Sequence, residues 1–378
     1  MKNFTLYNPT KLLFGKSQIQ NLGEEISSRG HKKILLIAGG GSIKKNDVYN
    51  QVTQSLNNSN IECKEIWGVQ PNPILSKVNE IIALAKEYRP DALLAVGGGS
   101  TIDTTKAVSA GVYLDNVWDA YEDWSLVKKA LPFFTVLTIS ATGSEMNMGS
   151  VVTNEDEKKK WALVNKNLFP QVSIIDPSIQ SSLPWNQTVN GAIDALMHTL
   201  EYYFLGKDED ITLSIDEGIV KSIIKSTNIL QKEENYEARA SLCLAATLAL
   251  NGTSGMMMEK GWSLHRIEHG LSAIYPKIAH GAGLGILFPA WCEHVYKNNE
   301  PIFLRWAKEV YNTQNIIDAI QKMKNQFSKW GAPTSLKQLD VKEEDLVLIA
   351  DNIFMNPEFK GIINFTKEDV LTILKNAY

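Results

Sequence analysis

Short, continuously apolar runs alternate with amphipathic stretches through the first half of the chain. The runs cover residues 33–38, 91–96, 133–138 and 172–176. Because they are apolar at nearly every position rather than at every second one, they predict strands of a sheet that is covered on both faces. Residues 78–88, between two of these runs, carry apolar side chains at helical spacing. Strands that alternate with helices predict a parallel α/β sheet.

The pattern changes after about residue 183, where strand-like runs largely disappear. Helical spacing of apolar residues marks the segments 187–203, 212–230, 236–252, 262–273 and 315–330. A chain of 378 residues is long enough for about two domains. We therefore predict an α/β domain with a Rossmann-like parallel sheet over residues 1–182 and an all-helical domain over residues 183–378. The charged run at residues 155–160 (EDEKKK) predicts the turn of a solvated hairpin.

Composition excludes several classes of protein. The chain has 42 acidic and 38 basic residues, a formal net charge of −4, which argues against nucleic-acid binding by bulk charge. The apolar runs are too short to span a bilayer, and the first residues (MKNFT) lack the apolar core of a signal peptide. Three widely spaced cysteines argue against a disulfide framework and for a reducing compartment. We therefore expect a cytoplasmic protein without a membrane or nucleic-acid partner.

Loops of small residues follow three of the predicted strands. The sequence GGGS occurs at residues 39–42 and again at 97–100, and ATGS occurs at 141–144. A glycine-rich loop between a strand and a helix lets backbone N–H groups approach a phosphate closely. One such loop alone could be a plain tight turn, but three at the carboxyl ends of parallel strands predict a dinucleotide site. The loops do not match the standard G-x-G-x-x-G fingerprint.

The loop at residues 39–42 also bears on the type of dinucleotide. An NAD site usually carries an acidic residue that binds the 2′-hydroxyl of the adenosine ribose. No acidic residue stands at the end of the strand at 33–38, whereas Ser42, Lys44 and Lys45 supply a hydroxyl and positive charge that suit a 2′-phosphate. The sequence therefore favours NADP(H).

Histidines and one aspartate are spaced so that they can meet at a metal ion. His198 lies four residues after Asp194, and His269 lies four residues after His265, so each pair projects from one face of a predicted helix. His280 follows in the same region, just before a Gly-x-Gly sequence. Each histidine alone would more simply be a surface or capped residue. Together, one carboxylate and several imidazoles suit a divalent transition metal such as Fe²⁺ or Zn²⁺.

These motifs resemble those of the iron-containing (group III) alcohol dehydrogenases, especially the branch of NADP-dependent butanol dehydrogenases and aldehyde reductases. The resemblance covers nearly the whole chain and is most specific over residues 176–201 and 265–283. It implies a fold like that of dehydroquinate synthase and hydride transfer between NADP(H) and a primary alcohol or aldehyde. It also implies a homodimer.

The resemblance implies a role for individual residues as well. The metal ligands would be Asp194, His198, His265 and His280. His269 would line the site, where it is a candidate catalytic proton relay because imidazole titrates near neutrality. The eleven positions from His269 to His280 are one more than is usual in the family. The nucleotide site maps onto Gly39, Gly40, Ser42, Gly97, Gly98, Ser100, Asp103, Thr138, Thr142 and Lys160.

Other functions remain open at this point. An NAD-dependent glycerol or diol dehydrogenase is the nearest alternative. A lyase resembling dehydroquinate synthase would use the same fold, but it would need clustered Arg and Lys residues for a phosphorylated substrate. A nucleotide-binding scaffold without activity would not need suitable ligands at all four metal positions.

Overall fold

A computed structural model describes residues 3–259, 261–355 and 359–378. Within them the chain forms two compact units. The sheet unit comprises Asn8–Leu183 and Glu234–Cys243, and the helical unit comprises the described residues up to Tyr7 together with Pro184–Glu233 and Leu244–Tyr378. The predicted boundary between residues 182 and 183 lies next to the change of unit at Leu183, but the sequence does not predict the excursions at the N-terminus and at 234–243. None of the described helices combines the length and apolar character that crossing a membrane requires.

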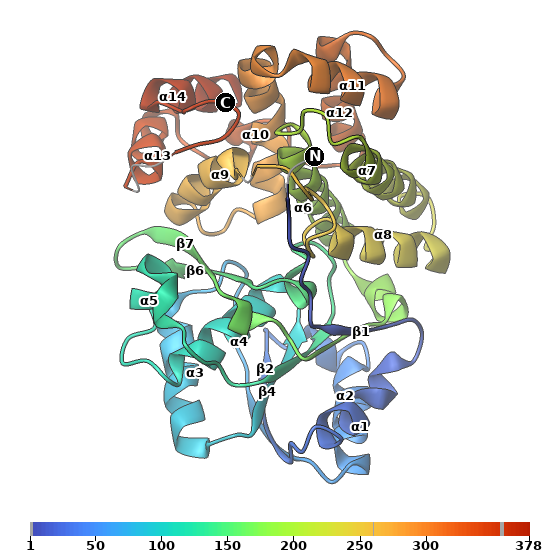
Figure 1. Ribbon diagram of the computed structural model, residues 1–378, viewed down its shortest axis with the longest axis vertical. Coiled ribbons are helices and arrows are strands. Elements are labelled where there is room, and N and C mark those ends of the chain that lie inside the picture. Colours follow the sequence, from blue (N-terminus) through green and yellow to red (C-terminus); the bar gives the residue numbers. More distant parts are fainter. Residues whose placement is uncertain (1–2, 260, 356–358) are drawn as a thin grey trace. The chain divides into compact units, whose positions relative to one another are not determined.

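The sheet unit is built on six parallel strands (Figure 1). In spatial order they are β1 (Lys11–Phe14), β8 (Val172–Ile175), β5 (Phe133–Leu137), β4 (Ala92–Gly97), β2 (Lys33–Ala38) and β3 (Glu62–Ile66). The prediction of a parallel α/β sheet is confirmed, and its four apolar runs are the four inner strands. The two strands that the pattern missed, β1 and β3, lie at the edges of the sheet, where one side of each strand is free and a continuous apolar run is not required.

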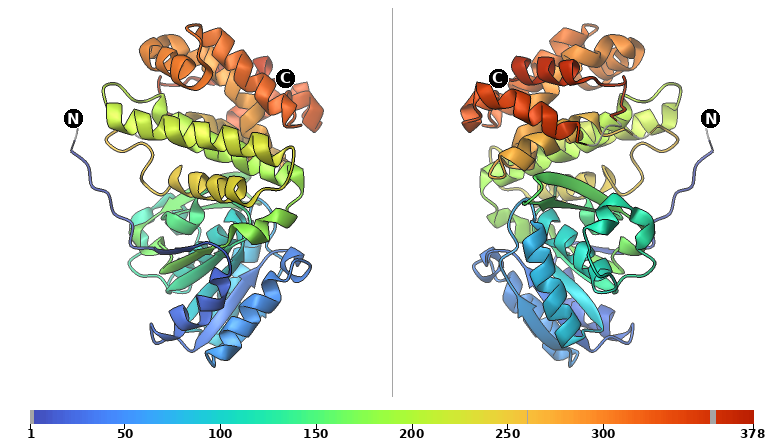
Figure 2. Two further views of the ribbon diagram at one scale, coloured as in Figure 1. Left: turned by 90° about the vertical axis from the view of Figure 1, so that its right-hand side faces the viewer. Right: turned by 90° about the vertical axis from the view of Figure 1, so that its left-hand side faces the viewer.

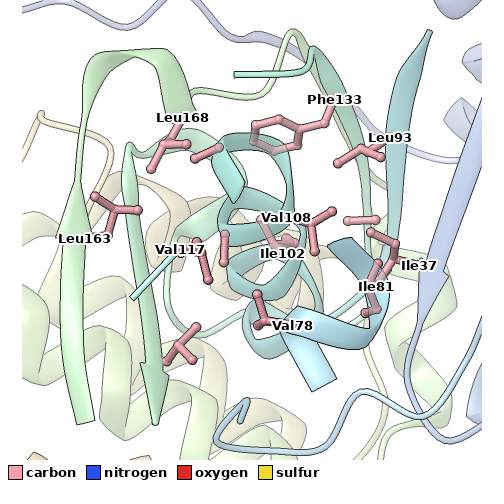
Figure 3. Packing of buried hydrophobic residues seen from close by; sticks show 14 of the residues in the cluster. Ile37, Val78, Ile81, Leu93, Ile102, Val108, Val117, Phe133, Leu163 and Leu168 are labelled. Atoms are coloured by element: carbon pink, nitrogen blue, oxygen red, sulfur yellow. The ribbon is translucent and has the colours of Figure 1, made fainter. Parts of the chain in front are cut away.

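Helices cover both faces of this sheet (Figure 1, Figure 2). They are α1 (Leu22–Ser27) and α2 (Val48–Asn58) on one face, and α3 (Leu75–Tyr88) and α4 (Gly99–Gly111) on the other. Alternate residues of β2 enter opposite cores, because successive side chains of a strand point to opposite faces. Leu36 packs with α1 and α2, whereas Ile37 packs with α3 and α4. Figure 3 shows the second of these cores gathered around Ile102 and Val108 of α4.

An antiparallel hairpin stands apart from the main sheet. Its strands are β6 (Gly149–Asn154) and β7 (Lys159–Val164), so the charged run at 155–160 does contain a turn. The turn itself is exposed, and Lys158 adopts a positive φ of 54° there. Lys160, in contrast, is buried. The hairpin prediction is therefore confirmed, but its last lysine is not part of a solvated face.

The helical unit confirms the prediction for the second half of the chain. Its helices are α6 (Trp185–Tyr203), α7 (Asp210–Leu230), α9 (Ser263–Ile274), α10 (His280–Val295), α11 (Glu300–Tyr311), α12 (Ile316–Lys329), α13 (Leu346–Ile353) and α14 (Lys367–Asn376). A further helix, α8 (Tyr236–Leu248), contributes its residues up to Cys243 to the sheet unit. Helix α6 packs against α7, α9 and α10, and it is buried along most of its length, as expected of a helix with neighbours on several sides.

Candidate metal centre and nucleotide loops

The metal-site candidates lie on three packed helices of the helical unit. Asp194 and His198 are one turn apart on α6, His265 lies in the first turn of α9, and His280 is the first residue of α10. Glycine permits the close approach of α10, because a Cβ on Gly281 would lie 2.0 Å from the carbonyl oxygen of Asn190 in α6. The eleven positions from His269 to His280 include a short turn that connects α9 to α10. In this turn the N–H of Ile278 donates to the carbonyl oxygen of Tyr275 at 3.0 Å.

The four predicted ligands meet around one carboxylate oxygen. Oδ1 of Asp194 lies 3.7 Å from Nδ1 of His198, 3.8 Å from Nε2 of His265 and 3.6 Å from Nε2 of His280. These distances are too long for hydrogen bonds. They are close to the separation of about 3.4 Å between ligand atoms that each lie about 2.1 Å from a tetrahedral ion.

Three of the atoms that face one another in this cluster lack hydrogen-bond partners. Oδ1 of Asp194, Nδ1 of His198 and Nε2 of His265 are buried and form no hydrogen bond with any residue that the structure describes. An unsatisfied buried polar atom is unfavourable by about 1–3 kcal/mol, so three of them at one point need an explanation. A cation among them would satisfy all three, and the mixed carboxylate and imidazole donors fit a divalent transition metal.

Two buried glutamates contact the Nδ1 atoms of His265 and His280 and so orient these rings. The carboxylate of Glu201, on α6, pairs with Nδ1 of His265 and accepts hydrogen bonds from the backbone N–H groups of Leu264 (2.7 Å) and His265 (2.9 Å). The carboxylate of Glu268, on α9, pairs with Nδ1 of His280. Each imidazole thus has Nδ1 against a carboxylate and Nε2 directed toward Asp194, an arrangement that fixes metal-binding histidines in many proteins.

Sequence reasoning assigned no role to these two glutamates, although a signal was available. Glu201 lies seven residues after Asp194, and Glu268 lies three residues after His265. Both spacings return to the same face of a helix.

Burial and charge interactions shift the pKa values of three residues in the cluster. Burial opposes ionisation of Asp194, yet His198, His265 and His280 together lower its pKa to about 2. Burial lowers the pKa of His198 to about 4, although Asp194 opposes this. Burial also disfavours protonated His265, but Asp194 and Glu201 raise its pKa to about 9. At neutral pH Asp194 is therefore ionised and His198 neutral, whereas His265 must release a proton when it binds a metal.

His269 lies beside the cluster but outside the group around Asp194. Its ring centroid is 5.5 Å from that of His280, and a ligand atom from each of Glu268, His269 and His280 lies within 4.8 Å of the others. The ring of Trp262 stands edge-on against His198 and His265, at centroid distances of 5.7 and 5.0 Å. The centre therefore has an aromatic ring next to two of its histidines and a further imidazole next to the third.

The three predicted phosphate loops lie at one edge of the sheet unit. They follow β2, β4 and β5, which are adjacent and parallel, so their carboxyl ends point the same way. Glycines are required here for packing, because a Cβ on Gly98 would lie 2.2 Å from Ile139 and a Cβ on Gly99 would lie 2.4 Å from the hydroxyl of Thr142. The loop after β2 is more open, since nothing lies within 4 Å of a Cβ built on Gly40.

The predicted nucleotide residues differ in how exposed they are. Gly39, Gly98, Ser100, Thr138 and Thr142 are partly exposed in the loops, and Gly40 and Ser42 are exposed. Three are buried: Gly97, Asp103 and Lys160. Lys160 donates to the side-chain oxygen of Asn72 at 3.1 Å.

Asp103 forms hydrogen bonds inside the sheet unit, in a network that also includes Lys106. No role for Lys106 was predicted from the sequence. The carboxylate of Asp103 accepts from the hydroxyl of Ser144 at 2.5 Å and from the N–H of Val151 at 3.0 Å. Fully buried Lys106, one turn later on α4, donates to Ser144 at 2.8 Å, to Asn147 at 2.9 Å and to the carbonyl of Gly149 at 2.8 Å. These two side chains tie the segment after the third phosphate loop to α4.

Comparison with protein families agrees with this geometry. The family model described as iron-containing alcohol dehydrogenase matches residues 9–177, and the model described as Fe-containing alcohol dehydrogenase family, C-terminal, matches residues 188–378.

Individual proteins are similar over the full length. The chain is 40% identical over 386 residues to the probable NADH-dependent butanol dehydrogenase 1 of Bacillus subtilis, covering 99% of both chains. It is 34% identical to the NADPH-dependent aldehyde reductase YqhD of Escherichia coli, covering 89% of both. Among solved structures, NADH-dependent butanol dehydrogenase A from Thermotoga maritima superposes with a TM-score of 0.97 at 47% identity, covering 100% of this chain and 99% of that one.

Proposed function

The chain belongs to the iron-containing alcohol dehydrogenase family, and from this premise we propose that it transfers a hydride between NADP(H) and a primary alcohol or aldehyde. The observation that carries the proposal is the position of three imidazole nitrogens within 3.6–3.8 Å of one oxygen of Asp194. We propose that Asp194, His198, His265 and His280 hold one divalent ion, Fe²⁺ or Zn²⁺. When bound, such an ion polarises a carbonyl oxygen as a Lewis acid.

The protein's own residues prepare this chemistry. Asp194 supplies one negative charge, and Glu201 and Glu268 hold the imidazoles of His265 and His280 in the orientation that directs Nε2 into the centre. We propose that Trp262, whose ring stands edge-on against two of the histidines, limits the access of water to them. These groups are in place before a substrate arrives, which lowers the entropic barrier to reaction.

A proton must move in the same reaction, and we propose His269 as the relay. Its ring lies 5.5 Å from His280 and is partly exposed, so it can exchange protons with water. An imidazole titrates near neutral pH and can therefore both take up and release a proton under physiological conditions.

The preference for NADP(H) is supported by the loop after β2. No acidic residue occurs between Ala38 and Asn46. The ammonium group of Lys44, two residues after Ser42, lies over the ring of Trp67, 4.1 Å from its centroid. Relatives are named for both NADH and NADPH, so the preference needs a direct measurement. We expect kcat/KM to be at least about tenfold higher with NADPH, and a Lys44→Ala variant to lose this advantage. A kcat/KM that is equal or higher with NADH would contradict the assignment.

For the substrate we propose a short-chain primary alcohol or aldehyde such as butanol or butanal. Relatives carry the names butanol dehydrogenase and aldehyde reductase, so a lyase reaction on the same fold is not favoured. We also propose a homodimer, because the segment before Asn8 exposes three large apolar side chains. Phe4, Leu6 and Tyr7 are 52%, 55% and 60% exposed. A monomeric mass in light scattering would contradict the dimer.

The activity is tested by following NADPH at 340 nm with butanal, before and after a chelator removes the metal. Activity should disappear with the metal and return when Fe²⁺ or Zn²⁺ is added. His294→Ala provides a matched control, since His294 lies outside the cluster and pairs with Asp369 at 2.9 Å. Chelated protein that reduces butanal at the full rate would contradict the proposed function.

A further inference from the structure

A second buried carboxylate in the helical unit lacks a hydrogen-bond partner among the described residues. Asp216, on α7, has no exposed surface, and neither oxygen of its carboxylate forms a hydrogen bond with a residue that the structure describes. The neighbouring Glu217 is different, because it accepts from the hydroxyl of Tyr203 at 2.9 Å and from Nε of Arg305 at 2.6 Å. An isolated buried carboxylate is strongly unfavourable unless something neutralises it.

Two buried hydroxyl groups lie in the same part of the unit and are also unpaired. Thr212 is one turn before Asp216 on α7, and therefore on the same face of the helix. Ser254 belongs to the loop between α8 and α9. Neither hydroxyl has a hydrogen-bond partner among the residues that the structure describes. The Ser254 hydroxyl and the N–H of Gly255 face the Asp216 carboxylate and favour its ionised form, although they do not reach hydrogen-bond geometry.

The loop that carries Ser254 is held close to α6. Gly255 has a φ of 68°, and a Cβ there would lie 2.6 Å from the ring of Tyr202. The backbone therefore restricts the position of Ser254, which is itself only 5% exposed. Its hydroxyl acts on the carboxylate of Asp216, and both side chains are buried away from bulk water.

Asp216 has no cationic neighbour in the described part of the chain. Burial is the main reason that the pKa of Asp216 is raised to about 7. Among the described residues, the charged group that acts on this pKa is Glu217, which is also negatively charged. No lysine or arginine among the described residues lowers this pKa. The geometry thus presents a buried carboxyl group, with two hydroxyl groups in the same region and without a described cationic side chain to compensate its charge when it ionises.

We propose that Asp216, Ser254 and Thr212 form a binding site for a monovalent alkali cation, Na⁺ or K⁺. The donors are all oxygen atoms, which suit hard cations rather than the transition metals that prefer imidazole. One carboxylate is neutralised by one monovalent charge, whereas a divalent ion would leave an excess positive charge in the interior. The site is separate from the Asp194 centre, and the proposal does not depend on the enzymatic activity.

Thermal unfolding of the metal-loaded protein tests the proposal. Wild-type protein at pH 8 is compared in KCl, NaCl and choline chloride at equal ionic strength, because choline is too large to enter the site. We expect Tm to be higher by about 2 °C or more in K⁺ or Na⁺. Asp216→Asn should show the same Tm in all three salts and should exceed wild type in choline. Asp208→Asn, an exposed control that precedes α7, should respond like wild type.

Three results would overturn the proposal. The first is a wild-type Tm that does not depend on the cation, and the second is an Asp216→Asn variant that responds as strongly as wild type. The third is a response to Ca²⁺ or Mg²⁺ alone, which would contradict a monovalent site.

A crystallographic measurement locates the ion independently of stability. Crystals of the full chain grown with Rb⁺ should show an anomalous peak between the Asp216 carboxylate and the Ser254 hydroxyl. Ser254→Ala should weaken the peak and raise the half-saturating K⁺ concentration several-fold. An ordered water at this position without anomalous signal would overturn the proposal, because hydration and protonation, not a cation, would then satisfy Asp216.

Discussion

Glu201 pairs with Nδ1 of His265, while Nε2 of the same ring lies 3.8 Å from Oδ1 of Asp194. Because Glu201 and Asp194 are both on α6, one helix holds both edges of an imidazole that belongs to α9. Glu201 also accepts the N–H groups of Leu264 and His265, so it fixes the start of α9 as well as its side chain. The orientation of this proposed ligand therefore depends on a residue that would not touch the metal.

The first prediction concerns this positioning residue. Glu201→Gln keeps the shape of the side chain but removes its charge, so it should weaken metal binding about 10–100-fold. Competition with a chelator measures the affinity. NADPH binding should stay unchanged, because Glu201 belongs to the helical unit and the phosphate loops belong to the sheet unit. Wild-type metal affinity in this variant would show that His265 does not need the carboxylate.

His269 is expected to affect turnover and not metal content. His269→Ala removes the proposed relay, so kcat should fall by about 10²-fold or more near neutral pH, with the bound metal retained. The measurement is a pH–rate profile together with metal analysis, and His294→Ala should behave like wild type. Full activity of His269→Ala across the pH range would remove the residue from the mechanism.

Lys106 is expected to stabilise the sheet unit. Lys106→Met keeps most of the apolar stem but removes one of the two lysines that compensate buried Asp103 and leaves the buried acceptors of Lys106 without their donor, which should lower the free energy of unfolding by about 3–5 kcal/mol. The KM for NADPH should also rise, because the loops after β4 and β5 lose their common anchor. Urea denaturation measures the stability. Lys86→Met, an exposed control on α3, should change it by no more than about 0.5 kcal/mol. Equal stability of the two variants would contradict the role of Lys106.

Stability should depend on pH through Asp216. Its pKa in the folded protein is about 7, above the ordinary value of 3.8, so the folded state holds a proton that the unfolded state releases. This contribution to stability is complete below about pH 4 and is lost as the pH rises to about 7. The groups that face Asp216 are Glu217 on its own helix, Tyr202 on α6, and the uncharged Ser254 and Gly255 of the loop.

The measurement is Tm in choline chloride from pH 5 to pH 8. The advantage of Asp216→Asn over wild type should increase from pH 5 to about pH 7 and level off above it, where Asp216 is ionised in both the folded and the unfolded protein. A difference between the two proteins that is constant over this range would mean that Asp216 does not titrate there.

The sequence predicts those elements of the fold whose burial shows in the pattern of apolar residues. The inner strands could be predicted because they are apolar on both faces; they are β2, β4, β5 and β8. The edge strand β3 (sequence ECKEI) could not, because its free side tolerates charge.

Some functional residues could likewise be predicted from the sequence, and others could not. Asp194, His198, His265 and His280 could be named because their spacing and motifs are distinctive, and the structure places them together. Lys106 and Asp216 could not, because lysine and aspartate are normally exposed and nothing in their local sequence signals full burial. Their environments depend on residues that are distant along the chain, such as Ser144 and Gly149 for Lys106 and Ser254 for Asp216.

The most direct test of the central claim is the metal content of Asp194→Asn. Asn keeps the volume of the side chain but removes the negative charge that the three histidines face. Protein purified without oxygen should contain stoichiometric divalent metal in the wild type and far less in the variant, with NADPH affinity equal within about twofold. A variant that retains stoichiometric metal would contradict the assignment of Asp194 as a ligand and, with it, the proposed centre.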